Sequence, residues 1–157
     1  MEYALKETAL VIATLLKERQ TILLRKGGIH EPSGQFQIEA RKFYLFPTYY
    51  HVNHDHFKPE VWDWIKEIEN KKPPEGEIHI PGWSELIDNQ WIGDEEELIK
   101  LGPKHIWSED YILERFHSGN QPGLNCLTLH THRLDPPLII PYDPSYQGCR
   151  SWAELKL

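Results

Sequence analysis

The hydrophobic pattern of the first 50 residues predicts a helix followed by two strands. Over residues 2–17 apolar side chains recur with three-and-four spacing, which is typical of a helix packed along a broad face. The β-branched residues Val11 and Ile12 favour an early strand as the alternative. Residues 20–25 form a short apolar run, and residues 36–46 alternate before they become continuously apolar. We expect these two strands to pair as a hairpin through a turn at residues 28–34.

The rest of the chain mixes expected helices with expected strands. An apolar stripe after Pro59 predicts a helix that ends before the KKPP segment, and good N-cap residues begin helices over 94–101 and 108–116. Residues 124–134 alternate strictly and predict a strand, with further strands at 77–80, 83–92 and 138–140, the second of these being a strand or a short helix. There is no βαβ rhythm, so we expect a single α+β domain over 1–157. Its sheet is predicted to be mixed or antiparallel, curled into a small barrel, with flanking helices.

Charge is unevenly distributed along the 157 residues, whose net charge is −7. An acidic balance of this size disfavours a general nucleic-acid coat. Residues 1–58, however, carry eight Lys/Arg against six Asp/Glu, whereas residues 59–157 carry nine against eighteen. The mildly basic first third can therefore face an anionic ligand.

Cysteine usage and the first residues bear on the cell compartment. Cys126 and Cys149 are too few for a disulfide framework and form no CxxC pair, so we expect reduced thiols. Residues 1–20 have neither a signal-peptide pattern nor an apolar run near the ~20 residues of a membrane span. We expect a cytoplasmic protein with no membrane partner. There is no GxGxxG or P-loop motif, and no cofactor is predicted.

The first candidate site is the sequence Arg25-Lys26-Gly27-Gly28 at the end of an expected strand. Two cations stand beside two glycines that let backbone N–H groups turn toward an anion, which is how phosphate and carboxylate nests are built. In the alternative interpretation the glycines form a hairpin turn and the cations are solvated.

Glu39 and Arg41 are expected on one face of the second strand, with Lys42 on the other. A carboxylate and two cations near a strand end are typical of metal-dependent nucleases, in which acidic residues hold magnesium. The arginine stands where that pattern has a lysine. A cross-strand salt bridge is the simpler interpretation.

Histidines supply a second candidate site, for a divalent metal. His51, His54 and His56 fall in one expected loop, and His130 and His132 share one face of a strand. Converging imidazoles can bind zinc, nickel or iron. No acidic or thiol ligand has a fixed offset from them, so surface histidines are the simpler interpretation.

Aromatic residues supply a third candidate site. Tyr49 and Tyr50 stand beside His51 after the second strand, and Trp107 and Trp152 are further candidates. Rings of this kind can stack on a flat ligand while hydroxyl and imidazole groups bond its edge, as happens with flipped or single-stranded bases. Ordinary core packing is the alternative.

Four blocks of sequence together carry a resemblance: residues 23–29 (LLRKGGI), 43–49 (FYLFPTY) with His51, 105–107 (HIW) and 148–152 (GCRSW). They resemble an uncharacterised bacterial family, the domain of unknown function 1802, which is noted beside restriction-endonuclease-type domains. The resemblance implies a link to nucleic-acid defence. A looser likeness is to PUA-like barrels of the ASCH and EVE groups, where a strand carries GxKxxExR. Residues 18–25 (ERQTILLR) supply only the final arginine of that pattern.

These observations favour a binding module as the leading hypothesis. The cations, rings and imidazole near the expected hairpin would form a pocket for an anionic or aromatic ligand, such as a nucleotide or a modified base in a nucleic acid. A metal-dependent nuclease or hydrolase is the rival hypothesis, with a divalent metal as its cofactor. A module that binds a protein partner through its acidic second half is the third.

Overall fold

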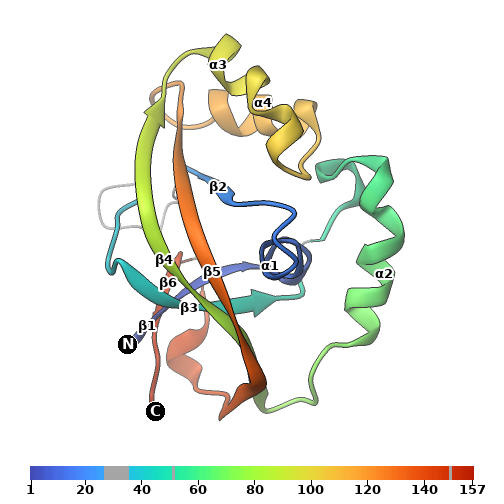
Figure 1. The fold of residues 1–157 in the computed structure, drawn as a ribbon, viewed down its shortest axis with the longest axis vertical. Helices are drawn as coiled ribbons and strands as arrows, with labels where there is room; N and C mark the ends of the chain where they lie inside the picture. Colours follow the sequence, from blue (N-terminus) through green and yellow to red (C-terminus); the bar gives the residue numbers. More distant parts are fainter. Residues whose placement is uncertain (27–35, 51, 149) are drawn as a thin grey trace.

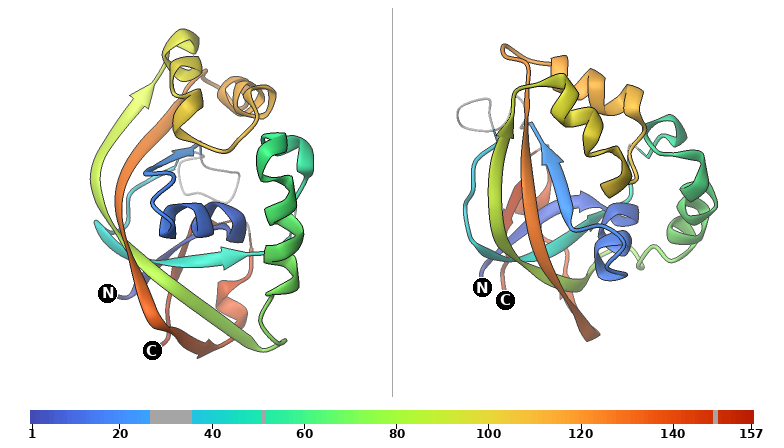
Figure 2. Two further views of the ribbon diagram at one scale, coloured as in Figure 1. Left: turned by 45° about the vertical axis from the view of Figure 1, so that its right-hand side comes forward. Right: turned by 45° about the horizontal axis from the view of Figure 1, so that its top comes forward.

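The computed structural model describes residues 1–26, 36–50, 52–148 and 150–157, and in it six strands form one curled sheet (Figure 1). The strands lie in the order β2-β5-β4-β3-β1-β6, with β1 parallel to β3 and the other pairs antiparallel. Helix α1 lies on the concave side, and the other helices flank the sheet (Figure 2). The predicted α+β class with a mixed, barrel-like sheet is confirmed. The strands are β1 (Tyr3–Thr8), β2 (Ile22–Arg25), β3 (Lys42–Thr48), β4 (Glu77–Ile92), β5 (Leu124–Pro141) and β6 (Trp152–Glu154).

The N-terminal segment is a strand joined directly to a helix, so the single helix predicted over residues 2–17 is wrong for its first half. Strand β1 is followed at once by α1 (Ala9–Leu16). Ala4 and Leu5 are both fully buried because β1 is covered on its two faces by different core clusters. A strand buried on both faces shows a continuous apolar run rather than alternation, so its periodicity cannot be distinguished from that of a buried helix.

The predicted hairpin between the second and third apolar runs is also wrong. Strand β2 pairs with β5, and β3 pairs with β1 and β4, so two strands separate β2 from β3 in the sheet. Residues 36–41, expected to extend the strand, precede β3. The proposed turn at residues 28–34 lies outside the described residues. Short apolar strands pair with whichever strand completes the sheet, and their own sequence does not select the partner.

The long hairpin of β4 and β5 gives the sheet its curl. Its pairing runs from Glu77 opposite Pro141 to Ile92 opposite Leu124, with irregularities at Ile80/Gly82 and Leu86/Asp88. Bulges of this kind bend a strand and increase its twist. At the first of them a Cβ on Gly82 would lie 2.5 Å from the backbone carbonyl oxygen of His132 and 2.7 Å from the Leu16 side chain of α1, so this glycine allows close approach of β5 and of the helix.

In the described residues three further helices flank the sheet as predicted, one from its apolar stripe and two from their N-cap signals. In α3 and α4 the side chains of Asp94 and Ser108 accept hydrogen bonds from the backbone N–H groups of Glu96 and Tyr111. Among the described residues no helix is long and apolar enough to cross a membrane. The helices are α2 (Trp62–Asn70), α3 (Glu95–Lys100) and α4 (Glu109–His117), with 3-10 turns at His54–His56, Pro59–Val61, Gly102–Lys104 and Pro144–Tyr146.

Candidate functional site

A cleft opens where the carboxyl ends of two parallel strands meet. Thr8 of β1 is the register partner of Thr48 of β3, so the residues that end these strands gather at one edge of the sheet. The end of β2, the loop before α4 and the loop before β6 complete the walls. The cleft has a volume of about 300 Å³ and is lined by Lys6, Glu7, Thr8, Arg25, Thr48, Tyr50, His56, Phe57, Trp107, Tyr111, Gly148, Arg150 and Ser151.

At this cleft an ion pair between Glu7 of β1 and Arg25 of β2 joins two strands that the curl of the sheet brings together. Glu7 Oε2 lies 2.9 Å from Arg25 Nη1, and the two side chains are only 9% and 17% exposed. Arg25 Nη1 also donates to the backbone carbonyl of Lys6 at 3.2 Å, and Glu7 Oε1 accepts from the backbone N–H of Thr8 at 2.9 Å. Because β1 and β2 are far apart in the strand order, this pair joins strands that only the curl brings together.

The Arg25 guanidinium has hydrogen-bond donors to spare. Nη1 makes both of the bonds above, and within the described part of the chain no acceptor is bonded to Nη2 or Nε. No buried polar side-chain atom among these residues lacks a partner, so the spare donors reach solvent. The guanidinium also lies over the Phe36 ring, 5.4 Å from its centroid, which fixes its plane. A planar, fixed set of donors therefore faces a ligand-sized space.

Lys6 anchors the loop on another side of the cleft. Its side chain is 7% exposed, and its ammonium donates to the backbone carbonyls of Tyr146 and, at 3.2 Å, of Gly148. These contacts hold the segment that leads to Arg150, whose exposed side chain stands on the cleft lining. Lys6 thus contributes positive charge and shapes the wall at once.

Aromatic rings form a further part of the lining. The His56 imidazole stacks on the Tyr111 ring with centroids 3.9 Å apart and planes at 9°, and burial raises the pKa of the Tyr111 phenol. Trp107 is 6% exposed and forms a fixed wall, whereas Tyr50 is 57% exposed. The cleft therefore combines rigid rings with one ring open to solvent, the arrangement of a site for a flat ligand.

A larger groove adjoins the cleft and shares Thr48, Tyr50 and Gly148 with it. Its volume is about 1130 Å³. The lining is rich in rings and prolines, and burial raises the pKa of the Tyr49 phenol within it. Its aromatic and proline lining residues are Phe46, Pro47, Tyr49, Tyr50, Pro73, Pro74, Tyr142 and Tyr146.

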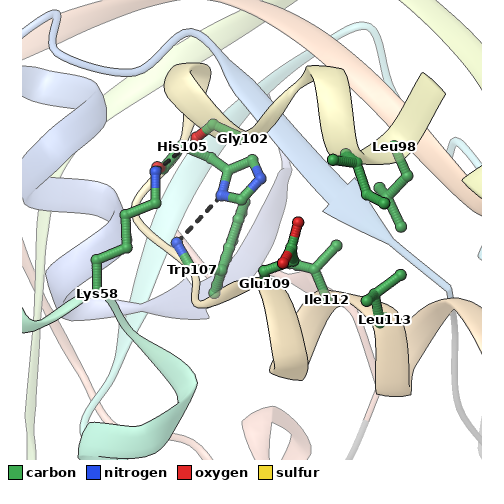
Figure 3. Close-up of a pocket in the computed structure, with 9 residues that line it drawn as sticks. Lys58, Leu98, Gly102, His105, Trp107, Glu109, Ile112 and Leu113 are labelled. Carbon is green, nitrogen blue, oxygen red and sulfur yellow. Dashed lines mark hydrogen bonds between the residues drawn. The ribbon is translucent and has the colours of Figure 1, made fainter. Parts of the chain in front are cut away.

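Behind Trp107 lies a third and much smaller hollow of about 40 Å³, which we call the His105 hollow (Figure 3). The Lys58 ammonium donates to the carbonyls of Gly102 and His105 at 2.5 and 2.6 Å, and His105 Nδ1 accepts from the backbone N–H of Trp107 at 3.2 Å. Burial, with the Lys58 charge as the second cause, lowers the pKa of His105 to about 4. This hollow holds a neutral imidazole near pH 7 and positions Trp107.

Of the predicted site residues, Arg25, Tyr50 and Trp107 line the cleft, but Lys26, Glu39 and Arg41 do not. The Lys26 ammonium donates to the carbonyls of Phe116 and Gln121 at 2.6 and 2.7 Å, and burial, aided by the Arg115 charge, lowers its pKa. Glu39 and Arg41 are exposed and precede β3. The seven residues of β3 separate them from the cleft by roughly 20 Å of strand.

The remaining predicted residues are divided between the core and the groove. Trp152 packs edge-on against Phe43 and stacks on Phe36 with centroids 6.0 Å apart, so it takes part in core packing. Tyr49 lines the groove. Gly27, Gly28 and His51 lie outside the described residues.

The histidines proposed as metal ligands do not converge in the described part of the chain, where no group of three potential ligands is close enough to hold a metal ion. His56 stacks on Tyr111, and His54 lies against Trp62 with centroids 5.9 Å apart. His132 stacks on Trp83 of the neighbouring strand, and His130 lies beside it.

Among the cleft residues that sequence reasoning missed are Lys6, Glu7, Tyr111 and Arg150. One signal for the first two was present, since an adjacent Lys-Glu pair interrupts an otherwise apolar stretch from Ala4 to Leu16. Charges inside an apolar segment are costly unless they are paired, and here both are paired. Arg150 lies in the block 148–152 that carries the family resemblance, whereas no local pattern marks Tyr111, which only the tertiary structure brings to the cleft.

Solved structures with a similar fold include ASCH proteins. The crystal structure of a serine-to-alanine mutant of the ASCH protein from Zymomonas mobilis has a TM-score of 0.57 at 12% identity, covering 99% of this chain and 88% of that chain. A tyrosine-to-phenylalanine mutant gives 0.57 at 13% identity, covering 99% and 90%, and the unsubstituted protein gives 0.54 at 13%, covering 99% and 87%. These similarities show that the chain has the fold of these ASCH proteins, a PUA-like fold, and confirm the looser likeness drawn from the sequence.

The chain belongs to the family described as domain of unknown function DUF1802, whose model matches residues 4–157. This match confirms the resemblance carried by the four sequence blocks. No curated protein sequence matches the chain.

Proposed function

We propose that the protein binds single-stranded nucleic acid and receives one nucleotide in the cleft. The observation that carries the proposal is the Glu7–Arg25 pair, which is largely buried yet keeps guanidinium donors directed to solvent between aromatic walls. The volume of about 300 Å³ is at the lower limit of small-ligand sites, which suits one nucleotide rather than a larger cofactor.

The charge arrangement favours a base over a simple anion. A site for free phosphate would keep carboxylates away, whereas Glu7 lies within the cleft and neutralises Arg25. A carboxylate beside a guanidinium offers acceptors and donors side by side, and the edge of a nucleobase presents the complementary set. Tyr50, Tyr111 and His56 offer ring faces for stacking, and Arg150 is placed to meet a phosphate.

A single strand fits this site better than a duplex. Base edges and faces in a duplex are covered by pairing and stacking, so a pocket of this depth is reached only by an unpaired or extruded nucleotide. Recognition of a modified base, and the defence context that the family resemblance implies, are the narrower form of the same proposal. They depend on which groups the donors of Arg25 and the acceptors of Glu7 meet.

Fluorescence anisotropy with a labelled single strand of about 12 nucleotides tests the proposal, at low salt and over a salt series. Arg25→Lys retains the charge beside Glu7 but loses the planar fork, and we expect affinity to fall about tenfold. Arg150→Ala should also weaken binding. The matched control is Arg41→Ala, an exposed cation outside the cleft, which should leave affinity unchanged.

Absence of binding at low salt would refute the proposal. Equal effects of Arg150→Ala and Arg41→Ala, with no effect of Arg25→Lys, would also refute it, because binding would then follow net charge and not the cleft. A duplex of the same sequence is expected to bind more weakly than the single strand.

A further inference from the structure

A second basic and aromatic surface lies beside α1 and α2. The ammonium of Lys17 and the guanidinium of Arg19 lie 4.7 and 4.9 Å from the centroid of the same Trp64 ring. Both cations are exposed and the indole is half-buried. Two cations held over one ring on the surface provide fixed positive charge next to a stacking face.

Next to this ring is a hollow of about 260 Å³ between α1 and α2, which we call the α1–α2 hollow. Lys17, Trp64, Lys71 and Arg133 line it, with Glu67 as the acidic lining residue. Lys71 pairs with Glu67 at 3.2 Å, whereas among the described residues Lys17, Arg19 and Arg133 make no salt bridge. In a chain with a net charge of −7, these cations make a local basic surface suited to phosphates.

The α1–α2 hollow and the cleft each share lining residues with the groove. Pro47 and Tyr49 line both the hollow and the groove, and Thr48 and Tyr50 line both the groove and the cleft. These four consecutive residues at the end of β3 are therefore a common wall of three adjoining spaces. With successive residues about 3.3 Å apart along an extended chain, they cover roughly 10 Å.

We infer that a single strand bound in the cleft continues past Tyr50 and Tyr49 and places its phosphates against Arg19, Lys17 and Arg133. This inference rests on the proposed function and adds that the ligand is an oligonucleotide rather than a free nucleotide. The acidic residues Glu75 and Glu77 also line the groove, so the phosphate backbone of the oligonucleotide is expected to follow the side of the groove that β3 forms. A protein partner is the alternative occupant, and failure of the tests below would favour it.

Competition binding with a dinucleotide and with single strands of about 4, 8 and 12 nucleotides tests the inference, with RNA and DNA of one sequence as separate arms. Affinity should increase with length until the strand spans the cleft and the α1–α2 hollow. The double variant Arg19→Ala with Arg133→Ala should weaken the longer strands about tenfold. It should also reduce the slope of log affinity against log salt by about 1.4, and it should leave the dinucleotide unaffected.

The matched control is the double variant Lys66→Ala with Lys100→Ala, two exposed cations that line none of the three spaces. It should change neither the affinity nor the slope. If the dinucleotide binds in competition but longer strands bind no tighter, or if both double variants have equal effects, the inference is overturned and the proposed function stands. If no ligand of any length binds, both are overturned. A preference for RNA over matched DNA would identify the 2′-hydroxyl as a further contact.

Discussion

The cleft and the His105 hollow are both lined by Trp107, but their charged groups have different roles. In the His105 hollow the Lys58 ammonium donates two of its three hydrogens to backbone carbonyls, and the imidazole is held neutral near pH 7. In the cleft the Glu7–Arg25 pair leaves donors directed to solvent, in a space of about 300 Å³ against about 40 Å³. A charge whose partners are all internal stabilises the fold, whereas a fixed charge with spare donors can bind a ligand.

Acid is expected to destabilise the fold through the protonation of His105. This is the largest of three effects on stability that we expect, the others being those of Glu7→Gln and Lys58→Met. The pKa of His105 is about 4 in the folded chain against 6.5 for the free side chain. Between these values the unfolded chain binds more protons at this residue, so its contribution to the free energy of unfolding is complete above pH 6.5. It is lost as the pH falls toward 4, by up to ~3 kcal/mol. Urea denaturation at a series of pH values measures this loss.

The matched variant His105→Asn keeps an acceptor for the Trp107 N–H group and removes the titration. Its free energy of unfolding should vary less with pH than that of the wild type over the same range. An unchanged pH dependence would show that another group is responsible.

Removing the carboxylate of the cleft should have the next largest effect on stability. Glu7→Gln leaves the Arg25 guanidinium without its counter-charge, and breaking a fully buried pair costs about 3–5 kcal/mol. Because Arg25 is 17% exposed, we expect a smaller loss of about 2 kcal/mol in the free energy of unfolding. Glu109→Gln in the lining of the His105 hollow is the control, since that carboxylate is exposed, and it should cost under about 0.5 kcal/mol. Equal losses from Glu7→Gln and Glu109→Gln would contradict the distinction between the cleft and the His105 hollow.

The smallest stability effect is expected from Lys58→Met. The carbonyls of Gly102 and His105 lose a donor, which costs roughly 1–2 kcal/mol when water replaces part of the bond. The pKa of His105 should rise at the same time, because the Lys58 charge is one cause of its depression. An NMR titration of the imidazole measures the change, with Lys66→Met as an exposed control on α2. A His105 pKa that does not rise would show that the Lys58 charge does not lower the pKa of this imidazole.

Local sequence signals identified most of the fold. The caps at Asp94 and Ser108 and the strict alternation after Leu124 act through neighbouring residues, and the structure has the elements they predict. The first strand was missed because burial on both faces removes alternation. The pairing of β2 with β5 was missed because strand partners are chosen by the whole sheet.

The candidate site could be predicted only in part, for a related reason. Arg25 was found from a cation next to a glycine turn, although its partner Glu7 comes from a strand that the curl brings near. Glu39 and Arg41 have the same chemistry in the sequence but are exposed at the other end of β3, where Arg41 donates to the backbone carbonyl of Leu86. Residue type indicates what a side chain can do, and only the topology determines which side chains meet.

NMR of the tryptophan indole N–H groups during titration with a single-stranded oligonucleotide tests the central claim most directly. Trp107 lies in the wall of the cleft, and Trp83 stacks on His132 outside the cleft, the groove and the α1–α2 hollow. We predict that the Trp107 signal shifts as the strand is added while the Trp83 signal stays in place. A ligand that shifts Trp83 and leaves Trp107 unchanged would contradict the account, because binding would then occur away from the Glu7–Arg25 cleft.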